Sequence, residues 1–250
     1  MKAFTAIIFC FVFQVHANAA EVVIDDFESG ILERLWEIEK ASDDAITIVQ
    51  NPQGIGNVVR FNWEKNAWDG TRKTKSAELK KGPFPGMPAL DIRMRIFLEK
   101  NLAITSNKPV IIMQIHSVPD FALGETYRHP VSALLLRNGH IFYSYRSSRP
   151  MVTPMFKGKW KYDSEEEVDL GAPNWGQWNS FQLQQHFDFK EEPKGSIKII
   201  LNDKAISIND LAVGFNDKQG PYFKFGVYCP QSFEQDVAVY FDDVSVTTLD

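Results

Sequence analysis

The sequence has almost no cysteine, which excludes a fold held together by disulfides. Only two cysteines occur among the 250 residues, and one of them, Cys10, lies in an N-terminal segment with the features of a removable leader. Without that leader, Cys229 has no partner in the chain, so no intramolecular disulfide can form. The fold must therefore rest on a hydrophobic core, which a chain of this length can supply.

Long hydrophobic runs are also missing after the first 20 residues. Within those 20, Lys2 precedes an apolar run over 6–15, and Ala17-Asn18-Ala19 provides a small-residue cleavage pattern. This arrangement predicts a secretory signal peptide over 1–20, because the apolar run is too short to span a bilayer. We therefore expect an exported mature protein of residues 21–250, periplasmic or secreted, with no membrane span.

The sequence lacks an excess of positive charge. Its formal net charge is −5 at pH 7, and Lys2 leaves with the leader. This balance makes a general nucleic-acid-binding protein a poor interpretation. An acidic polysaccharide remains a compatible partner, because a local basic cleft can lie on an acidic protein. The oligomeric state is left open by the sequence.

Helical patterns are scarce, and the dominant period is two. Apolar residues recur at every second position over 92–98, 181–189 and 237–241, and 197–208 has the pattern of a hairpin with its turn at 202–203. Such alternation predicts strands. The best helical segment, 31–40, is expected to form no more than a turn or two. Many strands joined by turns predict an all-β fold, a single two-sheet β-sandwich of the concanavalin-like jelly-roll type over 21–250.

One of the expected strands, 221–228, has an unusual polar face. Alternation places three apolar side chains on its core face. The opposite face then carries two phenols, an ammonium group and a glycine that leaves room for a close approach, namely Tyr222, Lys224, Gly226 and Tyr228.

A second strand, over 111–116, presents Gln114 and His116 on one face, and such hydrogen-bonding groups can hold a carboxylate. The alternative for His116 is a structural histidine whose hydrogen bonds are satisfied at the end of a strand. In a third segment, Arg72 and Glu78 share a face, a pattern that a solvated charged strand explains equally well.

In this order and spacing, the segments resemble the β-jelly-roll polysaccharide lyases, a group that includes alginate lyases, the heparin lyase I type and glucuronan lyases. Gln114-Ile115-His116 matches the Gln-Ile-His motif of alginate lyases, and 222–228 resembles their Tyr-Phe-Lys-Ala-Gly-x-Tyr strand, with Phe225 in place of Ala. The stretch 75–79 resembles an Arg-Thr/Ser-Glu-Leu strand, although Ser76 stands where that Arg belongs. The longer stretch 169–228 is more similar to the heparin-lyase and glucuronan-lyase branch.

The resemblance implies an enzyme that cleaves a uronic-acid polysaccharide by β-elimination without a metal or other cofactor. Neutralising the substrate carboxylate stabilises the charge that develops when the C5 proton leaves. By resemblance, Tyr228 is the catalytic tyrosine, acting as base, acid or both, and His116 is the partner base or neutralises the carboxylate. Gln114 would orient that carboxylate. The implied polymer-binding residues are Lys224, Arg72, Glu78 and Tyr222.

Three further features are candidates for function. Arg128 lies in a loop that can fold over the cleft and bind acidic sugars, and Tyr145 belongs to an aromatic and basic stretch that can do the same. For both residues, an equally good interpretation is that they are surface residues with no role in binding. A structural calcium is chemically possible between the terminal strands, but the spacing matches no defined calcium loop; its ligands would be Asp25, Asp26, Asp242 and Asp243.

Two other functions compete with the lyase. A non-catalytic carbohydrate-binding protein would keep the groove without turnover, and it has no need of Tyr228, His116 and Gln114 in one cleft. A glycoside hydrolase on the same sandwich needs two carboxylates facing each other across the cleft. No Glu-x-Asp-x-x-Glu strand is present to supply them, so this is the weakest interpretation.

Overall fold

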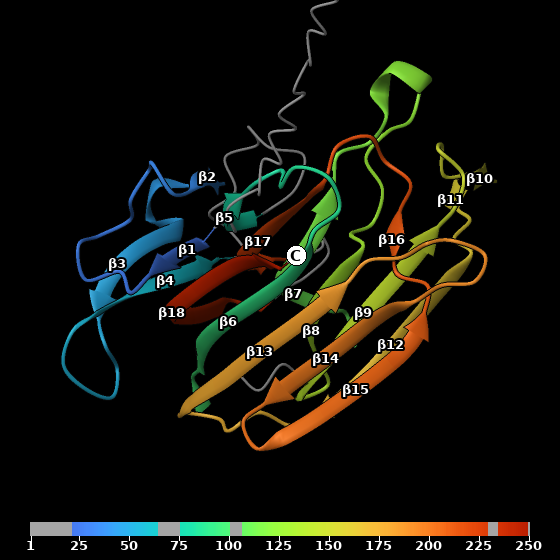
Figure 1. Cartoon of the computed structure of the whole chain (residues 1–250). Helices are drawn as coiled ribbons and strands as arrows, with labels where there is room; N and C mark the ends of the chain where they lie inside the picture. The colour runs from blue at the N-terminus through green and yellow to red at the C-terminus, as the bar shows by residue number, and fades with distance from the viewer. Residues whose placement is uncertain (1–21, 65–75, 101–106, 230–234, 250) are drawn as a thin grey trace, which may run out of the picture.

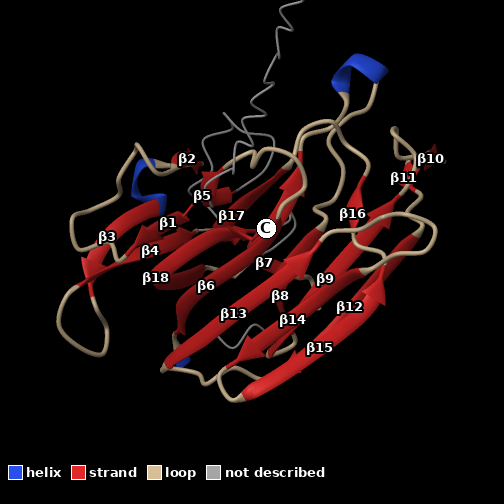
Figure 2. Cartoon of the chain, viewed as in Figure 1, coloured by secondary structure: helices blue, strands red, loops and turns tan. Residues whose placement is uncertain are grey.

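A computed structural model describes residues 22–64, 76–100, 107–229 and 235–249 (Figure 1). Strands dominate these ranges, and two short 3-10 turns lie between them, η1 (Asp43–Ala45) and η3 (Phe121–Leu123) (Figure 2). Two eight-stranded sheets pack against each other. The predicted all-β, two-sheet jelly-roll sandwich is confirmed.

One sheet, called sheet I, contains both the first and the last described strand. Its strands are β1 (Val22–Asp25), β3 (Ile46–Gln50), β4 (Asn57–Trp63), β6 (Ala89–Leu98), β13 (Trp178–His186), β14 (Gly195–Leu201), β15 (Lys204–Leu211) and β18 (Val237–Leu249). They are ordered β15-β14-β13-β6-β18-β4-β3, and β1 pairs with β18. The predicted hairpin is therefore confirmed, since β14 ends and β15 begins on either side of residues 202–203.

The other sheet, sheet II, contains the strands with polar faces. Its strands are β2 (Glu37–Lys40), β5 (Ser76–Lys81), β7 (Val110–Ser117), β8 (Ser132–Arg137), β9 (His140–Ser148), β12 (Ser164–Gly171), β16 (Gly214–Phe215) and β17 (Pro221–Tyr228). They are ordered β12-β9-β8-β7-β17-β5-β2, with β16 beside β9. A separate short hairpin consists of β10 (Met155–Phe156) and β11 (Lys159–Trp160).

The hydrophobic core lies between the two sheets. It includes side chains from Val23 near one end of the chain to Val246 near the other. Phe225 packs at its centre, with the rings of Trp36, Phe61 and Phe241 at centroid distances of 5.1, 5.4 and 5.1 Å. Edge-to-face contacts of this kind add to the burial of apolar surface. The face of β17 that carries Phe223, Phe225 and Val227 is thus the one that meets the core.

The segment 31–40 forms a single turn, within the turn or two expected, and its second half is a strand. The chain makes one turn, in which the Trp36 N–H donates to the Leu32 carbonyl at 3.1 Å, and then becomes strand β2. Trp36 is buried, and its indole N–H donates to Asp25 Oδ2 at 2.7 Å. This anchor and the pairing of β2 with β5 outweigh the local helical spacing, because tertiary contacts override intrinsic propensity.

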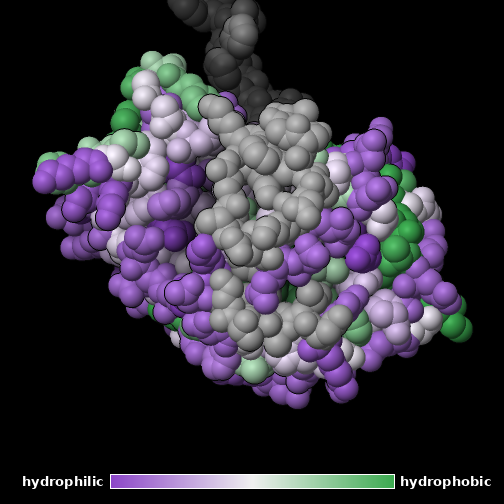
Figure 3. Space-filling model, turned by 180° about the vertical axis from the view of Figure 1, so that it is seen from behind, coloured by the Kyte–Doolittle hydropathy of each residue, from purple (hydrophilic) through white to green (hydrophobic). Residues whose placement is uncertain are grey.

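The described part of the surface seen in Figure 3 is mainly hydrophilic, and its apolar residues form only small groups. Neither of the described helical turns has the length or hydrophobicity that crossing a bilayer requires. Both observations agree with apolar side chains being gathered between the sheets.

Candidate functional site

A cleft of about 690 Å³ lies on the face of sheet II that points away from the core. Strands β2, β5, β17 and β7 form its floor, and the loop 127–130 and β11 contribute to its rim. Its lining residues are Glu39, Ser76, Glu78, Lys80, Ile111, Gln114, His116, Tyr127, Arg128, His129, Pro130, Trp160, Tyr222, Lys224 and Tyr228. The sequence-predicted residues Tyr228, His116 and Gln114 are therefore brought into one cleft.

The polar face of β17 follows the predicted alternation. Tyr222, Lys224 and Tyr228 line the cleft, while the phenylalanines between them are fully buried. Gly226 has φ of 139°, and a Cβ there would lie 2.1 Å from the Ala77 carbonyl oxygen. The glycine is therefore required by the approach of β17 to β5 at this point, rather than by space for a ligand.

Lys224 lies between two carboxylates on the cleft floor. Its Nζ is 2.6 Å from Glu39 Oε2 and 3.7 Å from Glu78 Oε2. Gln114 lies opposite Lys224 on the neighbouring strand, and its amide donates to Glu78 Oε1 at 2.5 Å. Gln114 and Lys224 thus form a compact donor pair, because both contact the carboxylate of Glu78.

His116 is almost fully buried at one end of this floor. Its ring stacks on Tyr222, with centroids 5.2 Å apart, and Nδ1 lies 3.0 Å from both the backbone nitrogen and the carbonyl oxygen of Ser117. Burial lowers the pKa of His116 to about 4, and the positive charges of Lys224 and Arg128 act in the same direction. The imidazole is therefore neutral at neutral pH.

Tyr228 lies at the other end of the floor. It pairs with Ile111, which is five residues before His116 on β7, and a bulge in β17 lies between this pairing and that of Phe225 with Met113. Burial raises the pKa of Tyr228, and the charge of Glu78 adds to this effect while Lys224 opposes it. Tyr228 is therefore a protonated phenol, and His116 and Tyr228 stand on opposite sides of the donor pair Gln114–Lys224.

Arg128 lines the rim, but its guanidinium group does not face a ligand. The side chain is 1% exposed and forms ion pairs with Glu125 and Asp217, both also buried. It donates to Ser117 Oγ at 3.2 Å and lies over the Phe215 ring at 4.3 Å. Because this buried pairing engages the charge of Arg128, the structure gives its predicted role in binding a sugar carboxylate no support.

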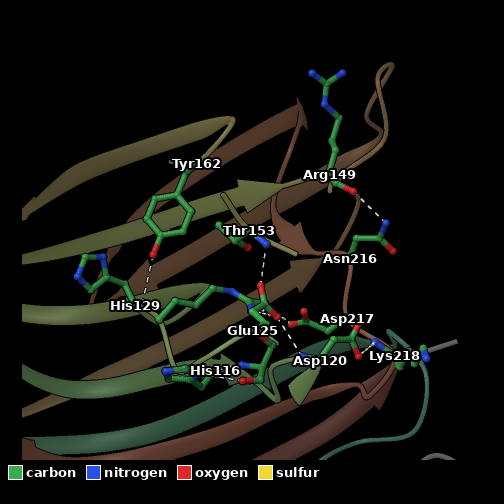
Figure 4. Close-up of polar contacts among 12 residues, drawn as sticks. His116, Asp120, Glu125, His129, Arg149, Thr153, Tyr162, Asn216, Asp217 and Lys218 are labelled. Carbon is green, nitrogen blue, oxygen red and sulfur yellow. Dashed lines mark hydrogen bonds and ion pairs between the residues drawn. The ribbon is translucent and has the colours of Figure 1, made fainter. Parts of the chain in front are cut away.

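These contacts join three segments of the chain behind the His116 end of the cleft (Figure 4). The carboxylate of Glu125 accepts the backbone N–H groups of Thr153 and Asp120 at 2.7 and 3.0 Å. Burial opposes its ionisation, but these bonds and Arg128 lower the pKa of Glu125. Burial raises the pKa of Asp217, although Arg128 opposes the shift. The cluster therefore acts as a structural support for the cleft wall.

Of the two remaining predicted residues, one lies in the core and the other outside the described residues. Tyr145 belongs to the hydrophobic core, on the same face of β9 as Tyr143, whose hydroxyl donates to Gln185. The expectation that Tyr145 stacks on a sugar is wrong, because alternation along β9 turns these phenols toward sheet I. Arg72 lies outside the described residues.

The aspartates of the terminal strands are engaged in other contacts. Asp25 accepts the Phe27 N–H at 2.9 Å besides the indole of Trp36, and Arg95 lies 3.3 and 3.2 Å from Asp242 and Asp243. Among the described residues, no three side chains of the metal-binding types come together. These partners account for the carboxylates without a cation, so the structure lends the calcium expectation no support.

Several lining residues are not among the sequence-predicted candidates, and Lys80, Glu39 and Trp160 show why. Lys80 follows Ser76 and Glu78 on the same face of β5, so alternation could have identified it. Glu39 is placed by the pairing of β2 with β5, which the sequence does not reveal. Trp160 reaches the rim from β11, and its position depends on the fold of a long connection.

Comparison with known proteins identifies the family. The sequence matches the family model described as polysaccharide lyase over residues 27–245, while none of the curated proteins matches it.

The structure is similar to endo-β-1,4-glucuronan lyase from the fungus Trichoderma reesei, with a TM-score of 0.66 and 16% identity, covering 86% of this chain and 91% of that chain. It is also similar to alginate lyase AlyC3 (TM-score 0.59, 14% identity, 92% and 90% covered) and to the marine PL-14 alginate lyase from Aplysia kurodai (0.56, 14%, 83% and 88%). The matched family model spans most of the described fold and its cleft, and the chain therefore belongs to the polysaccharide lyase family.

Proposed function

We propose that this chain cleaves a uronic-acid polysaccharide by β-elimination, leaving an unsaturated uronate at the new end. The observation that carries the proposal is that a single cleft combines Tyr228, His116 and the donor pair Gln114–Lys224. A phenol, an imidazole and two donors are the groups that such an elimination requires.

The donor pair supports a carboxylate-bearing substrate. Removing the C5 proton of a uronate places negative charge on the adjacent carboxylate, and donors that are already fixed stabilise that charge. Gln114 offers amide N–H groups and Lys224 an ammonium group, side by side on β7 and β17. Alginate and glucuronan, which the similar structures are named for, both carry a C5 proton next to a carboxylate. Heparin-like chains share this chemistry and belong to the same substrate class.

The proton transfers can be assigned from the ionisation states in the cleft. Tyr228, whose pKa is raised, holds its proton and can give it to the leaving O4. His116, whose pKa is lowered, is neutral and keeps an unprotonated nitrogen that can accept the C5 proton. The C4–O4 bond breaks as the C4–C5 double bond forms. In each turnover, His116 takes up the C5 proton and Tyr228 gives its proton to O4.

To accept the C5 proton, the His116 ring must give up one of its contacts with the backbone and contact the substrate instead. The ring is held by the backbone of Ser117 and Arg128. Such contacts commonly rearrange when a substrate binds. A His116→Gln variant separates the possible roles, because loss of a base lowers kcat by about 100-fold or more, whereas loss of a carboxylate contact chiefly raises KM.

Absorbance near 235 nm, where unsaturated uronates absorb, tests the proposal on alginate, glucuronan, heparin and heparan sulfate. A rise on one of these polymers identifies the substrate and the reaction together, and new reducing ends without that absorbance would indicate hydrolysis instead. The proposed chemistry uses no metal, so activity should persist in a chelator. We also propose that residues 1–20 direct export, and mass spectrometry of the exported protein should find a start near residue 21.

A carbohydrate-binding protein without turnover is the second candidate. The observations that favour it are the burial of His116 and the two carboxylates that already occupy Lys224. A flat absorbance trace on every polymer, together with retained binding to one of them, would support this function over the lyase.

A further inference from the structure

A second cavity of about 460 Å³ lies beside the cleft, between the turn at 33–36 and the end of β5. The buried Trp36 forms part of its wall, and the bond from its indole N–H to Asp25 fixes it there. The residues that line it are Glu33, Arg34, Leu35, Trp36, Glu37, Lys80, Lys81, Gly82 and Pro83. Since Lys80 lines both hollows, the second cavity opens next to the cleft floor.

A row of cross-strand neighbours connects the two hollows. Gln114 pairs with Lys224, Lys224 with Lys80, and Lys80 with Glu37. The row crosses β7, β17, β5 and β2 at nearly right angles and is about 14 Å long at the usual spacing between strands. This is longer than one sugar ring, so a chain lying along the row would extend from the donor pair toward the second cavity.

The charges along this path suit a polyanion. Arg34 is exposed, and the structure gives it no ion pair with any described residue. Lys80 is paired with Glu37 at 2.8 Å, but the Glu37 side chain is 61% exposed. Exposed pairs of this kind are weak, so a substrate carboxylate can replace Glu37. An arginine can then hold a further carboxylate through two parallel hydrogen bonds.

We infer that the second cavity is a distal subsite for the acidic polymer, in which Arg34 binds the carboxylate of a sugar unit away from the reacting bond. The inference rests on the proposed function, since it takes the same polymer to cross the row from Gln114 to Glu37. It implies that affinity grows with chain length until the chain reaches Arg34, and that long chains are cleaved internally.

The test compares oligomers of increasing length from alginate, glucuronan, heparin and heparan sulfate. Dissociation constants are measured calorimetrically in a Tyr228→Phe background, so that binding is observed without turnover, and KM is measured in the otherwise native chain. Arg34→Ala removes the contact, and Arg34→Lys keeps its charge. The matched control is Lys198→Ala, which removes an exposed charge from β14 on sheet I.

Arg34→Ala should weaken binding of long oligomers about tenfold, as expected for one charge-assisted contact, and leave the shortest bound oligomer unchanged. Arg34→Lys should recover part of this loss, and Lys198→Ala should have no effect. An equal effect of Arg34→Ala at every length, or none at any length, would overturn the subsite. If Arg34-dependent binding persists but no 235 nm product forms with the native chain, the elimination fails and the subsite stands; if no acidic polymer binds, both fail.

Discussion

His116 and Tyr222 face each other across β7 and β17, with their rings stacked at 5.2 Å and within 10° of parallel. The tyrosine next to the histidine is therefore Tyr222, while Tyr228 lies beyond the donor pair at the other end of the cleft floor. Burial raises the pKa of Tyr222 as well. The two phenols thus differ in their proposed roles: Tyr222 stacks on the imidazole that is proposed to accept the C5 proton, and Tyr228 is the proposed proton donor to O4.

The buried state of His116 predicts a specific dependence of stability on pH. The unfolded chain binds a proton at His116 with a pKa near 6.5, but the folded chain does so only at about 4. Protons therefore favour the unfolded state between these values, and the free energy of unfolding falls as pH decreases from 6.5 to 4, by up to about 3 kcal/mol.

Denaturant unfolding of the native chain and of His116→Gln, from pH 7 to pH 4.5, measures this contribution. The native chain should lose more stability than the variant over this interval, since the variant lacks the group. Parallel loss in both proteins would show that His116 is accessible and titrates normally. The same assignment predicts that kcat/KM has no acid limb near pH 6.5.

The buried cluster around Arg128 predicts a large effect from a single substitution. Arg128→Met leaves the carboxylates of Glu125 and Asp217 without their cation and should destabilise the fold by about 3–5 kcal/mol. Arg149→Met provides the control, since the Arg149–Asp163 contact at 3.4 Å is exposed and such pairs contribute less than about 1 kcal/mol. Equal unfolding midpoints for the two variants would contradict the assigned role of Arg128.

Removing the charge of Glu39 should increase the affinity for an acidic polymer rather than decrease it. Its carboxylate holds Lys224 at 2.6 Å and repels a negatively charged polymer. Glu39→Gln should therefore lower KM about fivefold at low salt, and the gain should shrink as salt screens the charges. Glu192→Gln makes the same charge change on an exposed turn beyond β13. A raised KM in Glu39→Gln would show that the glutamate itself contacts the substrate.

Much of the fold and half of the cleft could be predicted from the sequence because strand periodicity is local. Alternation along 221–228 and 111–116 identifies which side chains share a face, and the structure places Tyr222, Lys224 and Tyr228 together with Gln114 and His116 in the cleft. The same rule does not state which face of a strand meets the core. For 140–148, Tyr143 and Tyr145 lie on the core side, which the aromatic and basic composition of this stretch does not reveal.

Features that depend on long-range pairing could not be predicted. Glu39 reaches the cleft only because β2 pairs with β5, at a segment where the local spacing favours a helix. Arg128 lies in a loop, and sequence gives no sign that Asp217, 89 residues away, neutralises it in the interior. Sequence patterns therefore identify the chemical groups of this cleft more reliably than their partners.

Tyr228 is proposed to take part in the elimination, and a comparison of two tyrosine variants tests this role. Product formation at 235 nm is measured for the native chain, Tyr228→Phe and Tyr222→Phe on the polymer that the native chain cleaves. Tyr228→Phe should lose at least about 100-fold in kcat with its fold intact by circular dichroism. Tyr222→Phe should stay within a few-fold of the native chain, because the stack on His116 is kept. Full activity in Tyr228→Phe, or equal loss in both variants, would contradict the account.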